Sequence, residues 1–334
     1  MMGDAHIDGR LFILLVCILM ILIYPRFNRE DRFGIDAYTT QGKPATEMLA
    51  DAGKYINHVR YFRGEANAEV LREPWAYRPL PIYLASLLPF NPMTSINVVN
   101  VLFLIVGLYF LLKTISLMGL TQTSMCFAGF MFTVSFPVFF YTSVAYIDPV
   151  LIGFLCVGLY LIVAKRQLLF FLMLFLGAMV KDPYIIILPA WTIYQICLTP
   201  NKFVKAIVSS LLALLLFISL LYLIRLLTPV DESFFWVASL NGLEFNLSRP
   251  RAWIAWMLTF GPAGILATYF LFKENIRILK SPEIACCSVG MLGSFAVFGY
   301  SFFSVHLDGR YIWIAYPFMI PLACLLLENR TRTS

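Results

Sequence analysis

Charged residues are scarce in this chain. Asp, Glu, Lys and Arg make up 13% of its 334 residues, whereas 60% are hydrophobic. So little charge over this length excludes a water-soluble globular protein and predicts a polytopic membrane protein. The sequence also lacks a Gly-rich phosphate loop and the HExxH and GxSxG motifs, so none of these common motifs identifies its chemistry.

The cysteines form no recognisable framework. There are seven, no two have the CxxC spacing of a metal site, and all fall inside apolar segments. We therefore expect small apolar packing residues, without disulfides or a metal centre.

About ten apolar segments are long enough to cross a bilayer or a bundle interior, where a helix needs roughly 20 residues. The expected spans are Leu11–Tyr24, Ile96–Met118, Ser124–Tyr141, Pro149–Ala164, Gln167–Val180, Tyr184–Leu198, Val204–Leu227, Trp253–Phe272, Ile284–Val305 and Tyr311–Leu327. The fifth and sixth belong to one apolar stretch that only Lys181-Asp182-Pro183 interrupts. The predicted fold is an all-α transmembrane bundle in a single integral domain, 1–334.

Lysine and arginine predict the orientation, because they accumulate in short cytoplasmic loops. One set of connections and ends is rich in them: Lys113, Lys165, Arg166, Lys202, Lys205, Lys273, Arg277, Lys280, Arg330 and Arg332. Both termini, including the tail 328–334, are therefore expected in the cytoplasm, and the loop 26–95 is expected outside. The same rule explains the net charge of +6, so no nucleic-acid partner is needed. No small-x-small cleavage site follows the first span, which predicts an uncleaved anchor.

The outward loop 26–95 has helical patterning and many charges. Apolar residues from Thr46 to Phe62 recur on one face, which predicts an amphipathic helix at the membrane surface. Asp51 and Tyr55 are one turn apart and share a face of that helix. The apolar segment Pro79–Phe90 is too short to span, so it is expected at the interface or as a re-entrant segment.

Several segments, taken in order, carry a resemblance. They are Asp51-x-x-x-Tyr55 after the first span, then Tyr77-Arg78-Pro79-Leu80, Ala145-Tyr146-Ile147-Asp148-Pro149, Gly177-Ala178-Met179-Val180-Lys181-Asp182 and His306-Leu307-Asp308-Gly309-Arg310-Tyr311. In this order the chain resembles the GT-C superfamily of membrane glycosyltransferases. It departs from that pattern in two ways: the first acid usually comes sooner after the span, and several branches have a large soluble C-terminal domain. Asp36 lies closer to the span, but Asp51 fits the Asp-x-x-x-Tyr pattern and is favoured.

The resemblance implies a sugar donor carried on polyprenyl phosphate, transfer with inversion at the anomeric carbon, and a glycan or lipid acceptor. It also implies an active site on the outer face of a membrane. The short length suggests a bacterial inner-membrane enzyme that modifies lipopolysaccharide or another part of the cell envelope. Its metal requirement stays open, because the superfamily contains members with and without a divalent cation.

The chemistry of such a transfer assigns roles to particular residues. An acceptor hydroxyl needs a carboxylate as general base, for which Asp51 is the candidate. The departing lipid phosphate needs cations, for which Lys181, Arg78 and Arg310 are candidates. Asp148 can hold the acceptor, polarise the site or join Asp51 in binding a metal. Tyr55 and Asp36 are further candidates for binding substrate.

Each residue also has a simpler explanation. Asp51 can be a solvated partner of Lys54, Asp148 can cap a helix that Pro149 begins, and Lys181 can pair with Asp182. Arg78 and Arg310 can anchor the chain at the membrane surface. The competing functions are a lipid or solute transporter, a non-catalytic scaffold and, among enzymes, a polymerase or ligase for lipid-linked oligosaccharides.

Overall fold

The computed structural model describes residues 7–27, 50–230, 237–274, 281–304 and 308–333, and these residues form helices and no strand. The main helices are α1 (Gly9–Ile23), α4 (Ala50–Phe62), α5 (Pro79–Ser86), α6 (Pro92–Leu117), α7 (Gln122–Thr133), α8 (Phe136–Tyr141), α9 (Asp148–Val163), α10 (Gln167–Ala178), α11 (Ile187–Leu198), α12 (Phe203–Leu227), α13 (Leu240–Leu247), α14 (Pro250–Glu274), α15 (Pro282–Ser304), α16 (Arg310–Trp313) and α17 (Tyr316–Thr333). Short 3-10 turns include η1 (Tyr24–Arg26), η3 (Trp75–Tyr77) and η4 (Asp182–Ile186). The all-α class is confirmed for these residues.

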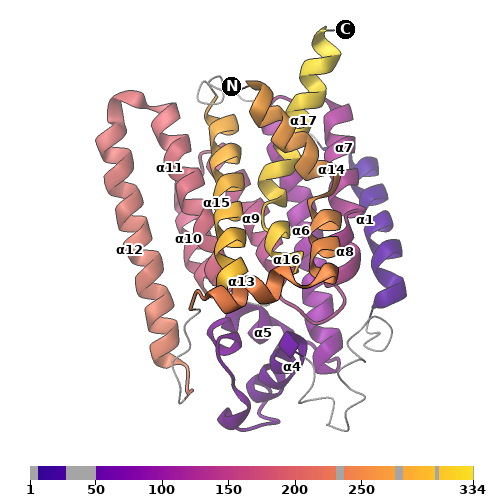
Figure 1. Cartoon of the computed structure of the whole chain (residues 1–334), viewed down its shortest axis with the longest axis vertical. Helices are drawn as coiled ribbons and strands as arrows, with labels where there is room; N and C mark the ends of the chain where they lie inside the picture. The colour runs from indigo at the N-terminus through magenta and orange to yellow at the C-terminus, as the bar shows by residue number, and fades with distance from the viewer. Residues whose placement is uncertain (1–6, 28–49, 231–236, 275–280, 305–307, 334) are drawn as a thin grey trace.

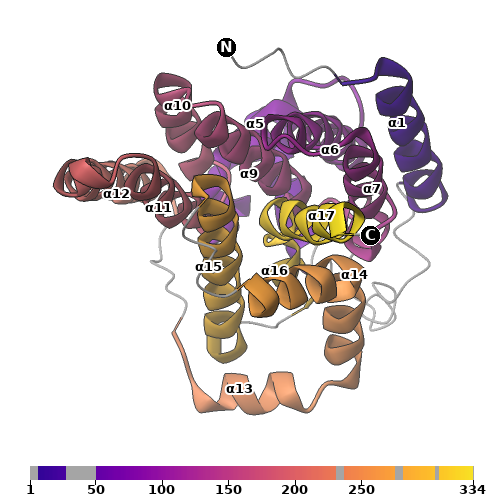
Figure 2. The same ribbon diagram turned by 90° about the horizontal axis from the view of Figure 1, so that it is seen from above.

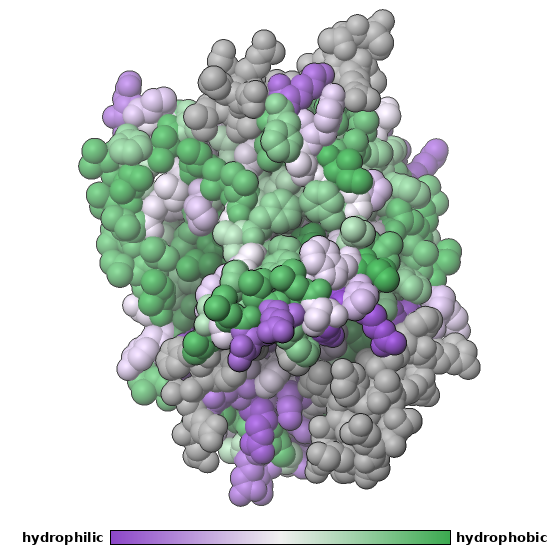
Figure 3. Space-filling view, viewed as in Figure 1, coloured by the Kyte–Doolittle hydropathy of each residue, from purple (hydrophilic) through white to green (hydrophobic). Residues whose placement is uncertain are grey.

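Long apolar helices dominate the bundle. Six segments of the described chain have the length and composition to cross a membrane: Gly9–Arg26, Pro92–Leu117, Gln122–Tyr141, Pro200–Leu227, Pro250–Lys273 and Pro282–Ser304. Three shorter apolar helices accompany them, at Asp148–Val163, Gln167–Ala178 and Tyr316–Glu328. In Figure 3 hydrophobic residues cover the middle of the face shown, and hydrophilic residues gather below it and along its upper rim. The chain is an integral membrane protein.

The two ends of the bundle differ. Helix α1 begins and α17 ends at the upper end in Figure 1, whereas α4 and α5 lie together at the lower end, beneath the other helices. Seen from above in Figure 2, α12 stands at the edge of the bundle beside α11, and α13 lies along another edge. Residues 28–49, between η1 and α4, are outside the described part of the chain.

Helix α9 is held at the centre by close packing on α6. A Cβ added to Gly153 would lie 2.5 Å from the carbonyl oxygen of Phe103, and one added to Gly107 would lie 3.0 Å from the Cα of Gly153. Side chains at these positions would force the helices apart, so glycine permits this contact. Nearly every residue of α9 is buried, which fixes the position of Asp148 at its first turn.

The predicted interruption at Lys181-Asp182-Pro183 is present. Helix α10 ends at Ala178, Lys181 has an extended backbone and η4 begins at Asp182. The amide of Leu80 in α5 donates to the carbonyl of Met179 at 3.2 Å. The break therefore brings Lys181 to the end of the bundle that α5 covers.

The first loop packs more tightly on the bundle than its amphipathic pattern suggested. Most apolar residues of α4, including Tyr55 and Val59, are buried in the main core, whereas Phe62 at its end is exposed. After α4, the guanidinium of Arg63 donates to the carbonyls of Leu88 and Phe90 at 2.7 and 2.8 Å. It therefore ties the end of α4 to the segment between α5 and α6.

A buried carboxylate joins α17 to the start of α7. Glu328 accepts hydrogen bonds from the hydroxyls of Thr121 and Ser124, each at 2.8 Å. A negative charge at a helix N-terminus is favoured by the helix dipole, and here it also satisfies buried hydroxyls.

We expect Glu328→Gln to lower the free energy of unfolding by about 1–2 kcal/mol, because the charge at the α7 N-terminus is lost. Thermal unfolding in detergent measures this. The exposed Glu69→Gln serves as the matched control, and equal stability of the two variants would contradict the role of Glu328.

Candidate functional site

Five helix ends and turns bring ionisable side chains together between the bundle and α4. Arg310, the first residue of α16, donates through Nη1 to Oδ2 of Asp51 at 2.6 Å. The same Nη1 lies 3.7 Å from Oδ2 of Asp148, at the start of α9. Lys181 donates to Oδ1 of Asp148 at 2.6 Å. Asp148 thus bridges two cations, and one of these also holds Asp51.

Arg78 and Tyr55 form a second part of this cluster. Arg78 precedes α5, and its Nη1 donates to the hydroxyl of Tyr55 in α4. Both side chains are buried. The charges of Tyr55, Asp182 and Asp51 outweigh the effect of burial and raise the pKa of Arg78 above its ordinary value, so this cation stays protonated.

Asp308 is a third carboxylate on Arg310. It accepts from the backbone amide of Arg310 at 2.8 Å, and both of its oxygens accept from Nε, at 3.1 and 2.9 Å. Gly309 lies between them against α14, where an added Cβ would be 2.2 Å from Oγ1 of Thr259. Glycine is therefore required for this close approach, and it fixes the turn that presents Arg310.

Aromatic rings form one wall of the cluster. The guanidinium of Arg310 lies 4.1 Å from the ring centroid of Tyr146, a cation–π arrangement that favours a buried cation. Tyr141 packs beside Tyr146 and against Trp313, with centroids 6.4 and 6.2 Å away. Tyr311 lies on the Lys181 side, with its ring centroid 5.8 Å from Nζ.

The C-terminal end of α12 also reaches this region. Arg225 lies 3.6 Å from the carboxylate of Asp182 and 5.3 Å from the ring centroid of Tyr77. Arg225 therefore links α12 to the turn that carries Lys181.

A cavity of about 280 Å³ opens beside the two cations Arg78 and Lys181. Its other walls combine the carboxylate of Asp182 with apolar and hydroxyl side chains from η4, α15 and α16: Pro183, Ile185, Val297, Tyr300, Ser301, Ser304 and Tyr311. A pocket lined by two cations, one acid and mixed walls suits an anionic headgroup with an apolar extension.

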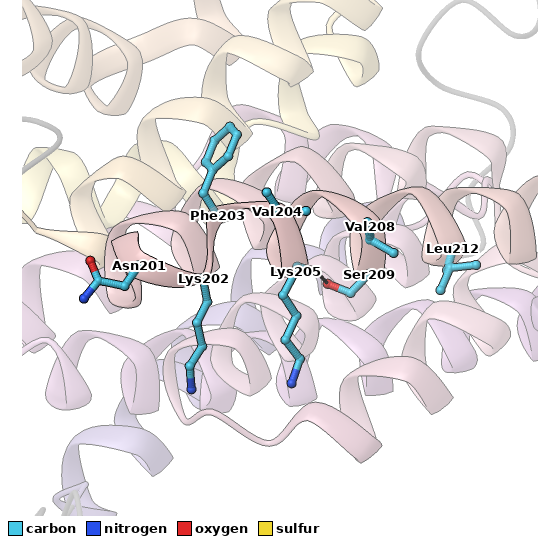
Figure 4. A pocket seen from close by; sticks show the side chains of 8 residues that line it. All are labelled: Asn201, Lys202, Phe203, Val204, Lys205, Val208, Ser209 and Leu212. Carbon is cyan, nitrogen blue, oxygen red and sulfur yellow. Dashed lines mark hydrogen bonds between the residues drawn. The ribbon is translucent and has the colours of Figure 1, made fainter.

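A second hollow lies along a single helix at the other end of the bundle. Figure 4 shows Lys202 and Lys205 extending to the same side of this segment, with Val208 and Leu212 further along it. Its lining contains no acidic residue. We therefore place the candidate site at the α4 end, where cations, acids and a cavity occur together.

The electrostatics of Asp51 follow from its partners. Burial would raise the pKa of this carboxyl, but the charge and hydrogen bond of Arg310, together with Arg78 and Lys181, hold the pKa below its ordinary value. For Asp308 burial is the largest cause and raises the pKa, against the attraction of Arg310. The carboxylates of Asp51 and Asp308, which both bind Arg310, therefore differ in basicity.

The simpler explanations can now be compared with the contacts. Asp51 pairs with Arg310, and no ion pair of Lys54 occurs among the described residues. Lys181 pairs with Asp148, whereas Asp182 pairs with Arg225. The carboxylate of Asp148 makes no capping bond for α9. These acids and cations interact across the fold instead of within their own segments.

Six of the seven site residues chosen from the sequence lie in this cluster: Asp51, Tyr55, Arg78, Asp148, Lys181 and Arg310. Asp36 lies outside the described residues. Among the described residues no group of three His, Cys, Asp or Glu side chains is arranged to hold a metal ion. Asp51 and Asp148 instead share Nη1 of Arg310, so we derive no step through a metal.

The sequence did not single out Asp308, Tyr146 and Tyr311, although each belongs to a segment that carries the family resemblance. The signal that could have identified them is closeness in the chain, since each is one or two residues from Arg310 or Asp148. His58 was also missed, and only its burial beside Tyr55 reveals it.

No family model matches this chain, and comparisons with curated proteins and solved structures found no match either. The assignment of the site therefore depends on the residues and contacts described above.

His58 connects the helix that carries Asp51 to the segment that leads to Arg78. It is 1% exposed, and its Nε2 accepts from the backbone amide of Arg72 at 3.1 Å. Burial, followed by the charges of Lys54, Arg78 and Arg72, lowers its pKa from 6.5 to about 3. The folded protein therefore holds a neutral imidazole.

We expect the free energy of unfolding to be unaffected by His58 above about pH 6.5 and to decrease as the pH falls from 6.5 toward 3. In that range His58 is protonated in the unfolded chain but still neutral in the folded protein. At pH 5 the loss is about 2 kcal/mol. Thermal unfolding between pH 7 and 5 tests this. His58→Gln keeps an acceptor without a titrating group, so its curve should be flatter; a slope equal to that of the wild type would refute the assignment.

Proposed function

We propose that this protein is a membrane glycosyltransferase that moves a sugar from a polyprenyl-phosphate donor to a glycan or lipid acceptor on the outer face of the membrane. The observation that carries the proposal is the assembly of three carboxylates and three cations at one end of an apolar bundle, beside a cavity with Arg78 and Lys181 at one end. A lipid-linked phosphate sugar needs this combination of charges near a bilayer surface.

The cations suit the donor. Arg78 and Lys181 face the cavity, and Arg310 is joined to Lys181 through Asp148. In the proposed reaction the bond between the anomeric carbon and the phosphate oxygen breaks, and its electron pair remains on the lipid phosphate. Fixed cations lower the barrier because they stabilise the charge that develops there.

The carboxylates suit the acceptor. The acceptor oxygen forms the new bond to the anomeric carbon while its proton passes to Asp51, our candidate general base. Asp148 is 3% exposed in its side chain, whereas Asp51 is 23% exposed. Asp51 is thus better placed to meet an incoming hydroxyl, and Asp148 acts by fixing Lys181 and Arg310.

The membrane arrangement belongs to the same proposal. Counting the shorter apolar helices and α11 with the six long segments, we infer ten spans, both termini in the cytoplasm and the α4 end outside. A bacterial inner membrane, with a cell-envelope acceptor such as lipopolysaccharide, fits a donor of this class.

Transport is the main competing function, and the position of the charges argues against it. Transport sites in helical carriers usually lie near mid-membrane, on broken helices. Here Asp148 and Arg310 begin their helices, Lys181 lies in the turn before η4, and Asp51 of α4 pairs with Arg310. The charges therefore gather at one end of the bundle.

Mass spectrometry of lipids and surface glycans tests transfer directly. We expect cells with wild-type protein to contain a sugar-modified product that falls about 100-fold or more in Asp51→Asn, because a general base contributes that much. Glu69→Gln, an exposed acid of the same loop, should retain the product. Equal product in all three, at equal protein levels with polyprenyl-phosphate sugar present, would reject the proposal.

Cysteine labelling tests the orientation. In a chain with Cys17 and Cys126 replaced by serine, an impermeant maleimide should label Glu69→Cys in intact cells. It should label Asn201→Cys, at the other end of the bundle, only after permeabilisation. The reverse pattern would place the cluster on the cytoplasmic side and contradict the proposed location.

A further inference from the structure

Arg310 is held by acids of two kinds. Asp308 is two residues away in the chain and bonds both the backbone amide and Nε of Arg310. Asp51 belongs to α4, 259 positions away, and bonds Nη1 alone. Asp308 thus binds the guanidinium at Nε, the nitrogen nearest the side-chain stem, and Asp51 binds it at the terminal nitrogen Nη1.

A phosphate could replace Asp51 as the partner of Arg310 Nη1. A carboxylate bound to guanidinium uses the same donors that a phosphate would use. Asp51 stands in the first turn of α4 and makes one hydrogen bond to Arg310, whereas Asp308 makes three. Their side chains are 23% and 31% exposed, so the number of bonds, and not exposure, distinguishes the two acids. Asp148 is different, because it is buried and holds Lys181 as well as Arg310.

The arrangement also places an incoming phosphate near this contact. Lys181 faces the cavity, and Asp148 is in contact with both Lys181 and Arg310. An anion held by Lys181 is therefore only about one carboxylate group away from Arg310. The hydrogen bonds of Arg310 to described side chains use Nε and Nη1. Its other terminal nitrogen, Nη2, therefore remains available to donate to a phosphate.

We propose that Asp308 is the fixed, positioning partner of Arg310 and Asp51 its exchangeable partner, and that the phosphate of the lipid-linked donor takes the place of Asp51. This rests on the proposed function and extends it to the order of events. Before the donor binds, Asp51 is neutralised by Arg310 and is a poor base. After the exchange, the phosphate has its cation and Asp51 is released to accept the proton of the acceptor.

Such an exchange couples base activation to the presence of the donor. It needs no movement of a domain, since Asp308, Gly309 and the Tyr146 ring keep Arg310 in place while one hydrogen bond is replaced. The exchange also predicts an unusual property: the residue required for turnover should weaken binding of the donor phosphate, because it competes for the same cation.

The test is a double-mutant cycle on the affinity for polyprenyl phosphate, measured with full-length protein in lipid nanodiscs. Asp51→Asn should bind roughly fivefold tighter than the wild type or better, since a competing ion pair is removed. In an Arg310→Gln background the same change should have no effect. If Asp51→Asn raises the affinity equally in the Arg310→Gln background, the cause is the loss of a negative charge near the site, and the exchange at Arg310 is overturned. An unchanged or weaker affinity in Asp51→Asn alone would also overturn it.

Infrared difference spectroscopy supplies a measurement that keeps Arg310 in place, should Arg310→Gln fail to fold. Adding polyprenyl phosphate should change one carboxylate band in the wild type. The change should be absent from Asp51→Asn, because in the wild type only the Asp51 carboxylate changes its partner. Its persistence in Asp51→Asn, or its absence from the wild type when polyprenyl phosphate is bound, would overturn the assignment.

These results separate the exchange from the proposed function. If the wild type binds no polyprenyl phosphate, the donor class is wrong and the exchange fails with it. If the wild type binds it and Asp51→Asn binds no tighter, the donor class stands and only the exchange is rejected.

Discussion

Pairing of buried charge is the constraint on which the site depends. Asp148 is 3% and Lys181 9% exposed in their side chains, and an isolated charge in such surroundings costs several kcal/mol. The ion pair offsets this cost, and Arg310, which lies beside Asp148, extends the pairing to Asp51. The positions of α4, α9, α16 and the turn before η4 are thus linked by one set of contacts.

The fold supplies this arrangement by ending helices at one level. Close glycine contacts hold α9 against α6, the break after α10 brings Lys181 to the same end, and hydrogen bonds of Arg63 and His58 fix the first loop there. Ends of helices leave backbone groups and side chains free to meet a ligand, whereas mid-helix positions are filled by packing. The site is therefore built where the apolar bundle stops, and its rigidity comes from the bundle.

The sequence was informative about the helices and the site residues for different reasons. Apolar runs of membrane length predict helices directly, and the break at Lys181-Asp182-Pro183 was visible because charge and proline interrupt such a run. Lys181 attracted attention because a charge between two apolar stretches is costly without a partner, whereas Asp148 and Arg310 were selected from the segments that carry the family resemblance. Their partners could not be read from the sequence. Local proximity suggested Lys54 for Asp51 and Asp182 for Lys181, and in both cases the partner comes from a distant element.

Two further features became visible only in the structure. Asp308 is two residues from Arg310, but only the geometry of three hydrogen bonds shows how firmly it holds that guanidinium. The surface helix predicted from Thr46 is seen from Ala50, and its apolar face meets protein because Tyr55 and Val59 fit the core. Periodicity gives the face of a helix but not what covers it.

Charge balance gives the cluster a further property. Asp51, Asp148 and Asp308 stand against Arg78, Lys181 and Arg310, three charges of each sign, so the cluster is close to neutral without a ligand. An arriving phosphate adds negative charge and must displace an acid from a cation or remain uncompensated in a partly buried site. Asp148 is held on two sides and Asp308 by its own neighbour in the chain. Displacement therefore falls on Asp51, which has a single hydrogen bond to Arg310, and the released carboxylate is able to accept a proton.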